Sequence, residues 1–280
     1  MNTANRLKHI QEYFFSRKLQ EVESMRQGGA DIINLGIGSP DLPPPPKVIE
    51  ILRQSAQNKN AHSYQSYRGV PTLRNAMQKW YLQQYQVSLD AATEILPLIG
   101  SKEGIVHICM TYLGKGDEAL VPNPGYPAYQ TAVELAEAKP VTYVLTEQNN
   151  WLPDFDVLEK MDLSKVKLMW VNYPNMPTGK TAERGLFQKL IAFGKKHNIL
   201  ICHDNPYSFI LNDKPLSILS VEGAKDTAVE LNSLSKSYNM AGWRVGMLVG
   251  AAHIINEVLK FKSNMDGSMV LPVQLAAAEA

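Results

Sequence analysis

The stretch Ser233-Leu-Ser-Lys236-Ser-Tyr-Asn-Met-Ala-Gly-Trp-Arg244-Val-Gly246 joins two runs that are typical of β-strands, at residues 227–232 and 244–250. Lys236 is therefore expected at the end of a strand, partly buried beside a sheet. Burial and a neighbouring cation, which Arg244 supplies, both disfavour the charged ammonium and lower the pKa of a lysine. An uncharged amine can form a Schiff base with a carbonyl compound. The stretch predicts a reactive lysine, whereas an exposed lysine in a polar loop is the alternative for a lone lysine.

Outward from this stretch, the chain alternates strand-like and helical patterns. Strands are expected near residues 94, 118, 140, 167, 199, 228 and 245, and helical patterns end near residues 26, 58, 85, 112, 137 and 197. Such alternation is typical of a doubly wound α/β domain. The sheet is expected to be mixed, because the connection between the last two strands is short for a parallel crossover. The first helix is predicted over residues 6–26 and ends at Gly28-Gly29.

Several of these strands are followed by residues that suit a binding site. Residues 100–104, Gly-Ser-Lys-Glu-Gly, form a tight turn before a helix, and the free backbone N–H groups of such a turn attract an anion. Tyr126 follows the strand near residue 118 and offers a flat ring, and Asp204 ends a buried strand. In open α/β sheets, ligands bind at such strand ends. Each feature alone has an ordinary alternative: a simple strand-to-helix connection, a packing tyrosine and a helix cap.

The composition is that of a globular protein with a small-molecule partner. The 280 residues include 28 Lys and Arg against 27 Asp and Glu, so the net charge of +1 indicates no surface for nucleic acid or an anionic membrane. Cys109 and Cys202 lie in apolar runs and form no disulfide framework, which is typical of buried thiols in a reducing compartment. The six histidines show no metal-ligand spacing. Because no apolar run is long enough to span a bilayer, a cytoplasmic location is expected.

Together, these segments resemble the class I/II aminotransferases, which use pyridoxal 5′-phosphate. The likeness runs from about residue 31 to residue 280 and is closest to the diaminopimelate-aminotransferase-like branch, as in residues 92–104 and 261–267. It implies fold type I of the pyridoxal-phosphate enzymes: a three-layer, doubly wound, seven-stranded mixed sheet with a partial small domain.

The resemblance also implies a division into domains. Residues 1–45 would be the N-terminal helix and substrate loop of the small domain, and residues 46–280 would be the large cofactor-binding domain. The C-terminal part of the small domain is expected to be absent. That part holds the family's arginine that pairs with the substrate α-carboxylate, so weak substrate binding is expected.

The resemblance implies a role for each residue at the strand ends. Lys236 would carry the cofactor as an internal aldimine and then move the proton between the substrate Cα and the cofactor. Asp204 would keep the pyridine nitrogen protonated, and Tyr207 would donate a hydrogen bond to the ring oxygen. The other implied contacts are Ser101, Lys102, Ser233 and Arg244 at the phosphate, Tyr126 on the ring, Gly38 near the substrate, and Tyr64, which would reach the partner's cofactor phosphate in a homodimer.

One residue departs from the family's asparagine-proline-threonine-glycine motif. Met176 stands where the asparagine would donate a hydrogen bond to the ring oxygen of the cofactor, and a thioether cannot donate one. Either Asn175 or Tyr207 covers that oxygen, or the electronic properties of the site are altered.

The implied function is the transfer of an amino group between an amino acid and a 2-oxo acid. Two alternatives use the same residues: a carbon–sulfur β-lyase, which shares the proton-abstraction chemistry, and a truncated protein that binds the cofactor without turnover. The branch makes diamino and acidic amino acids the donors to test, because the fold by itself does not decide the substrate.

Overall fold

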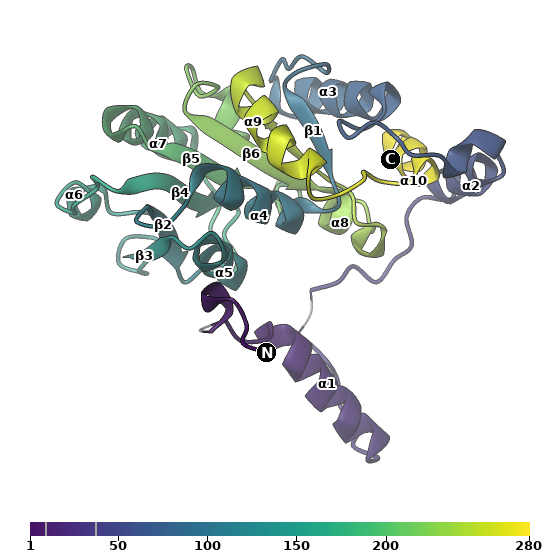
Figure 1. Ribbon diagram of the computed structural model, residues 1–280, viewed down its shortest axis with the longest axis horizontal. Coiled ribbons are helices and arrows are strands. Elements are labelled where there is room, and N and C mark those ends of the chain that lie inside the picture. Colours follow the sequence, from purple (N-terminus) through teal and green to yellow (C-terminus); the bar gives the residue numbers. More distant parts are fainter. Residues whose placement is uncertain (9, 37) are drawn as a thin grey trace.

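The computed structural model describes residues 1–8, 10–36 and 38–280, and its centre is a seven-stranded sheet (Figure 1). The strands follow the order β1-β7-β6-β5-β4-β2-β3 across the sheet. Their bounds are β1 Ile95–Leu98, β2 Glu118–Asn123, β3 Lys139–Val144, β4 Val166–Asn172, β5 Leu200–Asp204, β6 Ala228–Ser233 and β7 Gly246–Gly250. Each strand begins within one residue of its predicted position. The α/β fold predicted from the alternating pattern is confirmed.

The sheet is mixed, as predicted. β7 runs antiparallel to both of its neighbours, β1 and β6, whereas the other neighbouring strands pair in parallel. The connection from β6 to β7 holds only the one-turn helix α8, Leu234–Ser237, and the 3₁₀ turn Ala241–Trp243, which is too little for a parallel crossover with its usual helix. Ser233 pairs with Gly246 across the two strands, so Lys236 and Arg244 lie in one loop that is closed at its base.

Helices cover both faces of the sheet. Those on one face share a core that includes Cys109, Trp170 and Cys202, and both cysteines are buried and free, as expected. The helices of this face are α4 Ser101–Tyr112, α5 Pro127–Leu135 and α9 Ala252–Ser263, and those of the other face are α2 Pro46–Ala56, α3 Pro71–Tyr85, α6 Phe155–Leu158, α7 Arg184–His197 and α10 Leu271–Glu279. α2, α3 and α5 each begin at a proline, whose fixed φ and missing N–H suit that position. α9 has no counterpart among the predicted helices.

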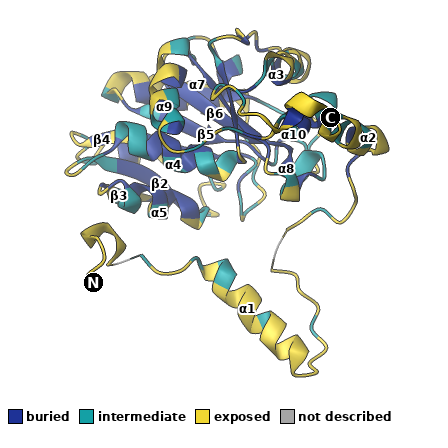
Figure 2. Ribbon diagram, turned by 45° about the vertical axis from the view of Figure 1, so that its right-hand side comes forward, coloured by how far each residue is buried: buried dark blue, intermediate teal, exposed yellow. Residues whose placement is uncertain are grey.

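The N-terminal region differs from its prediction. The helix expected over residues 6–26 is replaced by a 3₁₀ turn, Asn5–Leu7, and by α1, Phe14–Gln27, which ends at Gly28 as predicted. None of the α1 residues is buried, and Figure 2 shows this helix away from the sheet. Residues 10–13 are not helical, because the backbone of Tyr13 (φ −53°, ψ 125°) lies outside the helical region and so α1 begins after it. His9 lies outside the described residues.

Among the described helices, none has the length and apolar character that crossing a bilayer requires.

Candidate active site

A cavity of about 510 Å³ lies where three parallel strands end. Its lining includes Asn172, Asp204 and Ser233, the last residues of β4, β5 and β6. Nine of the ten residues predicted for the site line it: Gly38, Ser101, Lys102, Tyr126, Asp204, Tyr207, Ser233, Lys236 and Arg244. The tenth, Tyr64, is 98% exposed and lies outside the cavity.

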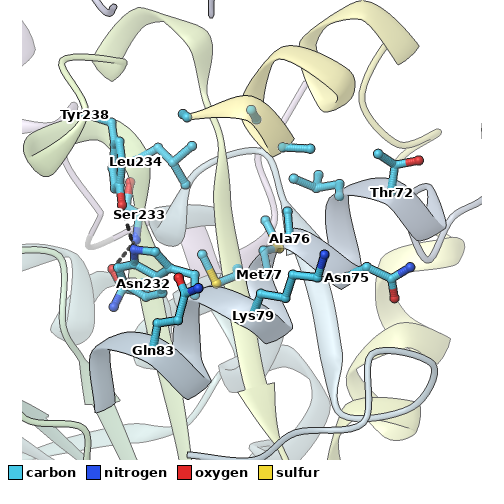
Figure 3. A pocket seen from close by; sticks show the side chains of 16 residues that line it. Thr72, Asn75, Ala76, Met77, Lys79, Gln83, Asn232, Ser233, Leu234 and Tyr238 are labelled. Atoms are coloured by element: carbon cyan, nitrogen blue, oxygen red, sulfur yellow. Dashed lines mark hydrogen bonds between the residues drawn. The ribbon is translucent and has the colours of Figure 1, made fainter. Parts of the chain in front are cut away.

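A second cavity, of about 570 Å³, lies between α3, α10 and the segment that follows β6 (Figure 3). Figure 3 shows aliphatic side chains such as Leu234 and Met77 around it, and Trp80 donates to the Tyr238 hydroxyl at 2.6 Å. Its lining shares Ser233 with the first cavity but includes neither Lys236 nor any carboxylate side chain. The reactive groups therefore belong to the smaller cavity.

Lys236 stands directly after β6, in α8, and is half-buried. Its Nζ donates to the backbone oxygen of Gly38, which lies in the N-terminal arm, the residues that precede α2. Burial and the nearby Arg244 lower the pKa of Lys236, the two causes expected from the sequence. The amine is therefore more readily uncharged, and able to act as a nucleophile or a base, than an exposed lysine.

A cationic corner, made by Lys102, Lys236 and Arg244, forms at the start of α4. Gly100 has a φ of +81°, and a Cβ there would overlap the Arg244 guanidinium, so glycine lets the guanidinium lie against the turn. Arg244 Nη1 donates to the Ala241 oxygen at 2.9 Å, and burial together with Arg244 lowers the pKa of Lys102. Within residues 1–8, 10–36 and 38–280, none of the three cations pairs with a carboxylate. Together with the positive end of the α4 dipole, they make an anion site.

Asp204 is the buried acid of the cavity, with 3% of its surface exposed. The Tyr129 hydroxyl donates to Oδ2 at 2.8 Å, and Oδ1 has no hydrogen-bond partner among the described residues. Burial raises the pKa of Asp204 to about 6, although the Tyr129 hydrogen bond and the charge of His203 act to lower it. An unpaired buried carboxylate oxygen is costly, so Oδ1 is suited to accept a hydrogen bond from a bound group.

The Met176 side chain cannot donate a hydrogen bond to the ring oxygen of the cofactor, so a neighbouring residue would have to do so. Met176 lines the cavity, and its backbone N–H donates to Asn172 Oδ1 at 2.7 Å. Asn175 does not line the cavity, and its Oδ1 accepts hydrogen bonds from the backbone and hydroxyl of Thr178. Tyr207 does line it, next to Asp204. Of the two replacements considered from the sequence, this arrangement favours Tyr207.

The structure adds residues that the sequence analysis did not single out. From the N-terminal arm, Tyr13 and Phe15 line the cavity, and the Lys102 ammonium lies 3.9 Å from the centre of the Tyr13 ring. Tyr129, which holds Asp204, stacks on Trp170 with ring centres 5.1 Å apart. The remaining additions to the lining are Gly36, Asn172, Pro206, Ser235 and Ala241. Only the spacing of Tyr129, three residues after Tyr126, could have drawn attention to it.

His203, the residue before Asp204 on β5, belongs to a buried polar network. Its Nδ1 lies 2.8 Å from Glu230 Oε2, and its Nε2 lies 3.0 Å from the Tyr173 backbone oxygen. Tyr81 donates to the other oxygen of Glu230 at 2.8 Å. His203 does not line the cavity, so it supports β5 next to Asp204 rather than meeting a ligand.

These features fit pyridoxal phosphate. The cationic corner suits the phosphate group, and the free Oδ1 of Asp204 suits a protonated ring nitrogen. The lowered pKa of Lys236 suits an amine that reacts with an aldehyde. Tyr126 lines the same cavity and offers a ring face for packing.

Comparison with known proteins agrees with this geometry. Residues 30–280 match the family model described as aminotransferase class I and II. The LL-diaminopimelate aminotransferase of Dehalococcoides mccartyi is 44% identical over 282 residues, which cover 100% of this chain and 73% of that protein. The substrate-bound structure of BacF from Bacillus subtilis is 41% identical, with a TM-score of 0.93 over 99% of this chain and 71% of that one. A probable N-succinyldiaminopimelate aminotransferase from Thermus thermophilus is 32% identical, with a TM-score of 0.88 over 95% and 72% of the two chains. The protein therefore belongs to the class I and II aminotransferases, which are pyridoxal-phosphate-dependent enzymes.

Proposed function

We propose that this aminotransferase takes its amino group from a diamino dicarboxylic acid, with LL-diaminopimelate as the first candidate, and passes it to a 2-oxo acid. Two of the similar proteins are named for diaminopimelate or its N-succinyl derivative, which supports this donor class. The observation that carries the function is one cavity with a lysine of lowered pKa, a buried acid and a cationic corner. Among the described residues, Oδ1 of that acid has no hydrogen-bond partner and the three cations contact no carboxylate. The relatives are named as aminotransferases, and nothing in this cavity favours the lyase or the binding-only alternative.

The phosphate and ring contacts follow from the positions around the cavity. Arg244 and Lys102 would hold the phosphate, with Ser101 and Ser233 beside them, and Tyr126 would pack on the ring. Asp204 would accept a hydrogen bond from the ring nitrogen at its free Oδ1. Tyr207 would donate to the ring oxygen in place of the asparagine that Met176 replaces.

The chemical step depends on the Lys236 amine. When bound, pyridoxal phosphate supplies an aldehyde that joins an amine and a ring that withdraws electrons as the substrate Cα–H bond breaks. Lys236 Nζ accepts the Cα proton because burial and Arg244 favour its uncharged form, and it then returns the proton as a general acid. The Asp204 charge stabilises the electron-poor ring while that proton is transferred.

We place one further phosphate contact on a second copy of the chain. Tyr64 is 98% exposed and lies outside the cavity of its own chain, which suits a residue that completes the partner's site in a homodimer. Residues 1–45 contribute Tyr13, Phe15 and Gly38 to the lining, and we assign them to the small domain. A monomer in analytical ultracentrifugation of the active enzyme would contradict the site that Tyr64 is proposed to share.

We also propose a cytoplasmic location, because both cysteines are free and buried.

The half-reaction tests the proposed function. Protein loaded with pyridoxal phosphate is mixed with LL-diaminopimelate, N-succinyl-LL-diaminopimelate, glutamate or phenylalanine, while the visible absorbance of the cofactor and the release of a 2-oxo acid are followed. Fastest conversion with LL-diaminopimelate is expected. Conversion with another donor alone would overturn the substrate, and no conversion with any donor would overturn the function. Release of pyruvate from a cysteine thioether without an amino acceptor would show a lyase instead.

Tyr129→Phe should shift the pH dependence of cofactor binding. The change removes the hydrogen bond that lowers the pKa of Asp204, so this pKa rises above its value of about 6. More of the acid is then protonated near neutral pH. As the pH is lowered, the affinity for pyridoxal phosphate should therefore begin to fall at a pH about one unit higher than in the wild type. Dissociation constants measured from about pH 5 to about pH 9, a range that includes both midpoints, check this.

Tyr143→Phe is the matched control for that experiment. The Tyr143 hydroxyl donates to the Trp170 backbone oxygen at 2.7 Å, so its loss removes a similar buried hydrogen bond without touching Asp204. Its pH midpoint should stay at the wild-type value. Equal midpoints in the Tyr129→Phe protein and the wild type would contradict the role of Tyr129.

A further inference from the structure

A buried ion cluster lies between α4 and α9, outside the active-site cavity. Lys262, near the end of α9, is 1% exposed, and its Nζ lies 2.6 and 2.7 Å from the two oxygens of Asp266 and 3.0 Å from Glu103 Oε1. His107, one turn after Glu103 on α4, is fully buried and places Nε2 2.8 Å from the same oxygen. Figure 1 shows α4 and α9 packed against each other, and the cluster joins the start of one helix to the end of the other.

The cluster contains its own cation. Glu103, His107 and Asp266 bring three possible ligand atoms within 4.8 Å of one another, a spacing that could hold a metal ion. The Lys262 ammonium already contacts both carboxylates, and three charge-assisted hydrogen bonds offset the cost of burying it. A buried network of this kind fixes the positions of its members.

Glu103 connects the cluster to the cationic corner. It lies in the first turn of α4, directly after Ser101 and Lys102, which both line the cavity. Its Oε2 accepts a hydrogen bond from the backbone N–H of Ile99, the residue before the N-cap Gly100. The contact resembles that of a capping-box acid but reaches one residue further back. One carboxylate therefore closes the turn through Oε2 and is anchored by Lys262 through Oε1.

We propose that Lys262 is a positioning residue for the cofactor phosphate: its ammonium fixes Glu103, which holds the backbone of residues 99–102 in the shape that binds the anion. This inference rests on the phosphate contacts proposed above for Ser101 and Lys102. Without the ammonium, the Glu103 and Asp266 carboxylates would lose their shared cation and keep the His107 ring as a common contact, at 2.8 and 3.5 Å. Like charges repel strongly in such a site, which is largely shielded from water. Glu103 would then turn away from Asp266, and the N–H of residue 99 would lose a charged acceptor. Lys262 does not line the cavity, so its effect must pass through Glu103.

Lys262→Met tests this inference with two ligands that differ by one group. The dissociation constants of pyridoxal phosphate and of pyridoxal, which has the same ring and aldehyde but no phosphate, are measured from the absorbance of the bound ligand. The constant for pyridoxal phosphate should rise about tenfold or more, the loss expected for one hydrogen bond to a charged group. The constant for pyridoxal should change less than about twofold. Equal weakening of both ligands, or of neither, would overturn the inference.

Lys225→Met is the matched control. The Lys225 ammonium lies 2.7 and 3.0 Å from the oxygens of Glu94. Glu94 directly precedes β1, whereas the turn of residues 99–102 follows the other end of that strand. The same change of side chain there should leave both dissociation constants unchanged. A selective loss of pyridoxal phosphate binding in this control as well would overturn the specific role of Lys262.

Arg244→Ala separates a failure of this inference from a failure of the phosphate assignment. It removes a cation from the corner and should also weaken pyridoxal phosphate selectively. If it does not, the assignment of the corner is wrong and the inference falls with it; if it does while Lys262→Met does not, only Lys262 loses its role. Should Lys262→Met fail to fold, Asp266→Asn takes its place, because its side chain is 12% exposed and the amide keeps an acceptor oxygen. A smaller loss of affinity for pyridoxal phosphate, with the affinity for pyridoxal unchanged, supports the inference. An equal loss of affinity for both ligands overturns it.

Discussion

Replacing Lys236 with alanine should lower the rate of transamination about 10⁴-fold or more, because one amine provides both the bond to the cofactor aldehyde and the proton transfer at the substrate Cα. The fold should survive the change. Lys236 is half-buried, and the one hydrogen bond of its Nζ among the described residues goes to the backbone oxygen of Gly38. Rates of the half-reaction with LL-diaminopimelate, together with thermal unfolding followed by circular dichroism, check both expectations.

Lys139→Ala is the control for this substitution. Lys139 lies on the edge strand β3 with 72% of its side chain exposed, and its ammonium contacts Glu118 at 3.0 Å, away from the cavity. Its half-reaction rate should match that of the wild type. Appreciable transamination by the Lys236→Ala protein would refute the assignment of Lys236, and loss of activity in both variants would point to a general defect instead.

The second large effect is expected for Asp204→Asn, with a rate about 10³-fold lower than the wild type. Asparagine has the same shape and keeps an oxygen that can accept from the Tyr129 hydroxyl, so the geometry of the site should be retained. The amide carries no charge, so it cannot favour a protonated ring nitrogen, and the negative charge that develops at the substrate Cα is stabilised less. The rate of the half-reaction at saturating cofactor measures this effect. A loss of less than about tenfold would contradict the role of Asp204.

The same substitution should increase the stability of the cofactor-free protein at high pH. The pKa of Asp204 is about 6 in the folded protein against an ordinary value of 3.8, so the folded state binds this proton more tightly than the unfolded chain. Ionised Asp204 therefore destabilises the fold at high pH, and this cost disappears as the pH falls through the folded-state pKa. The free energy of unfolding of Asp204→Asn minus that of the wild type should be about 2 kcal/mol larger at pH 8 than at pH 4. Urea denaturation at both pH values measures this difference in the free energy of unfolding between the variant and the wild type. An equal difference at pH 4 and pH 8 would contradict the raised pKa of Asp204.

Much of the site could be predicted because its residues follow strands that the sequence marks clearly. An apolar run ending in Asp204, or in Ser233 shortly before Lys236, is a local pattern. Parallel strands bring their carboxyl ends to one edge of the sheet, so such residues meet without further information. Arg244 joins them because β6 and β7 pair at the base of a single loop.

The residues that were missed are those whose partners lie far away in the sequence. Tyr129 reaches Asp204 across 75 positions, and Lys262 reaches Glu103 across 159. No local pattern encodes such a pairing, because it depends on the strand order and on which helices share a face. The predicted first helix was too long at its start, because apolar spacing alone does not show that the backbone of Tyr13 leaves the helical region just before α1.

Local sequence patterns were enough to predict the seven strands, the mixed α/β fold, the family resemblance and the position of Lys236 at the end of a strand. These follow from apolar periodicity, glycine and proline positions and short motifs, which act over a few residues. Tertiary packing alone set the hydrogen bonding of Asp204, whose Oδ2 accepts from Tyr129 while Oδ1 has no partner among the described residues. Packing also brought the buried Lys262 ammonium to Glu103, which accepts from the N–H of Ile99. It also left Tyr64 exposed and outside the lining of the cavity. The physical reason is that burial and hydrogen-bond pairing are properties of the packed layers, and they exist only once the sheet has brought distant segments together.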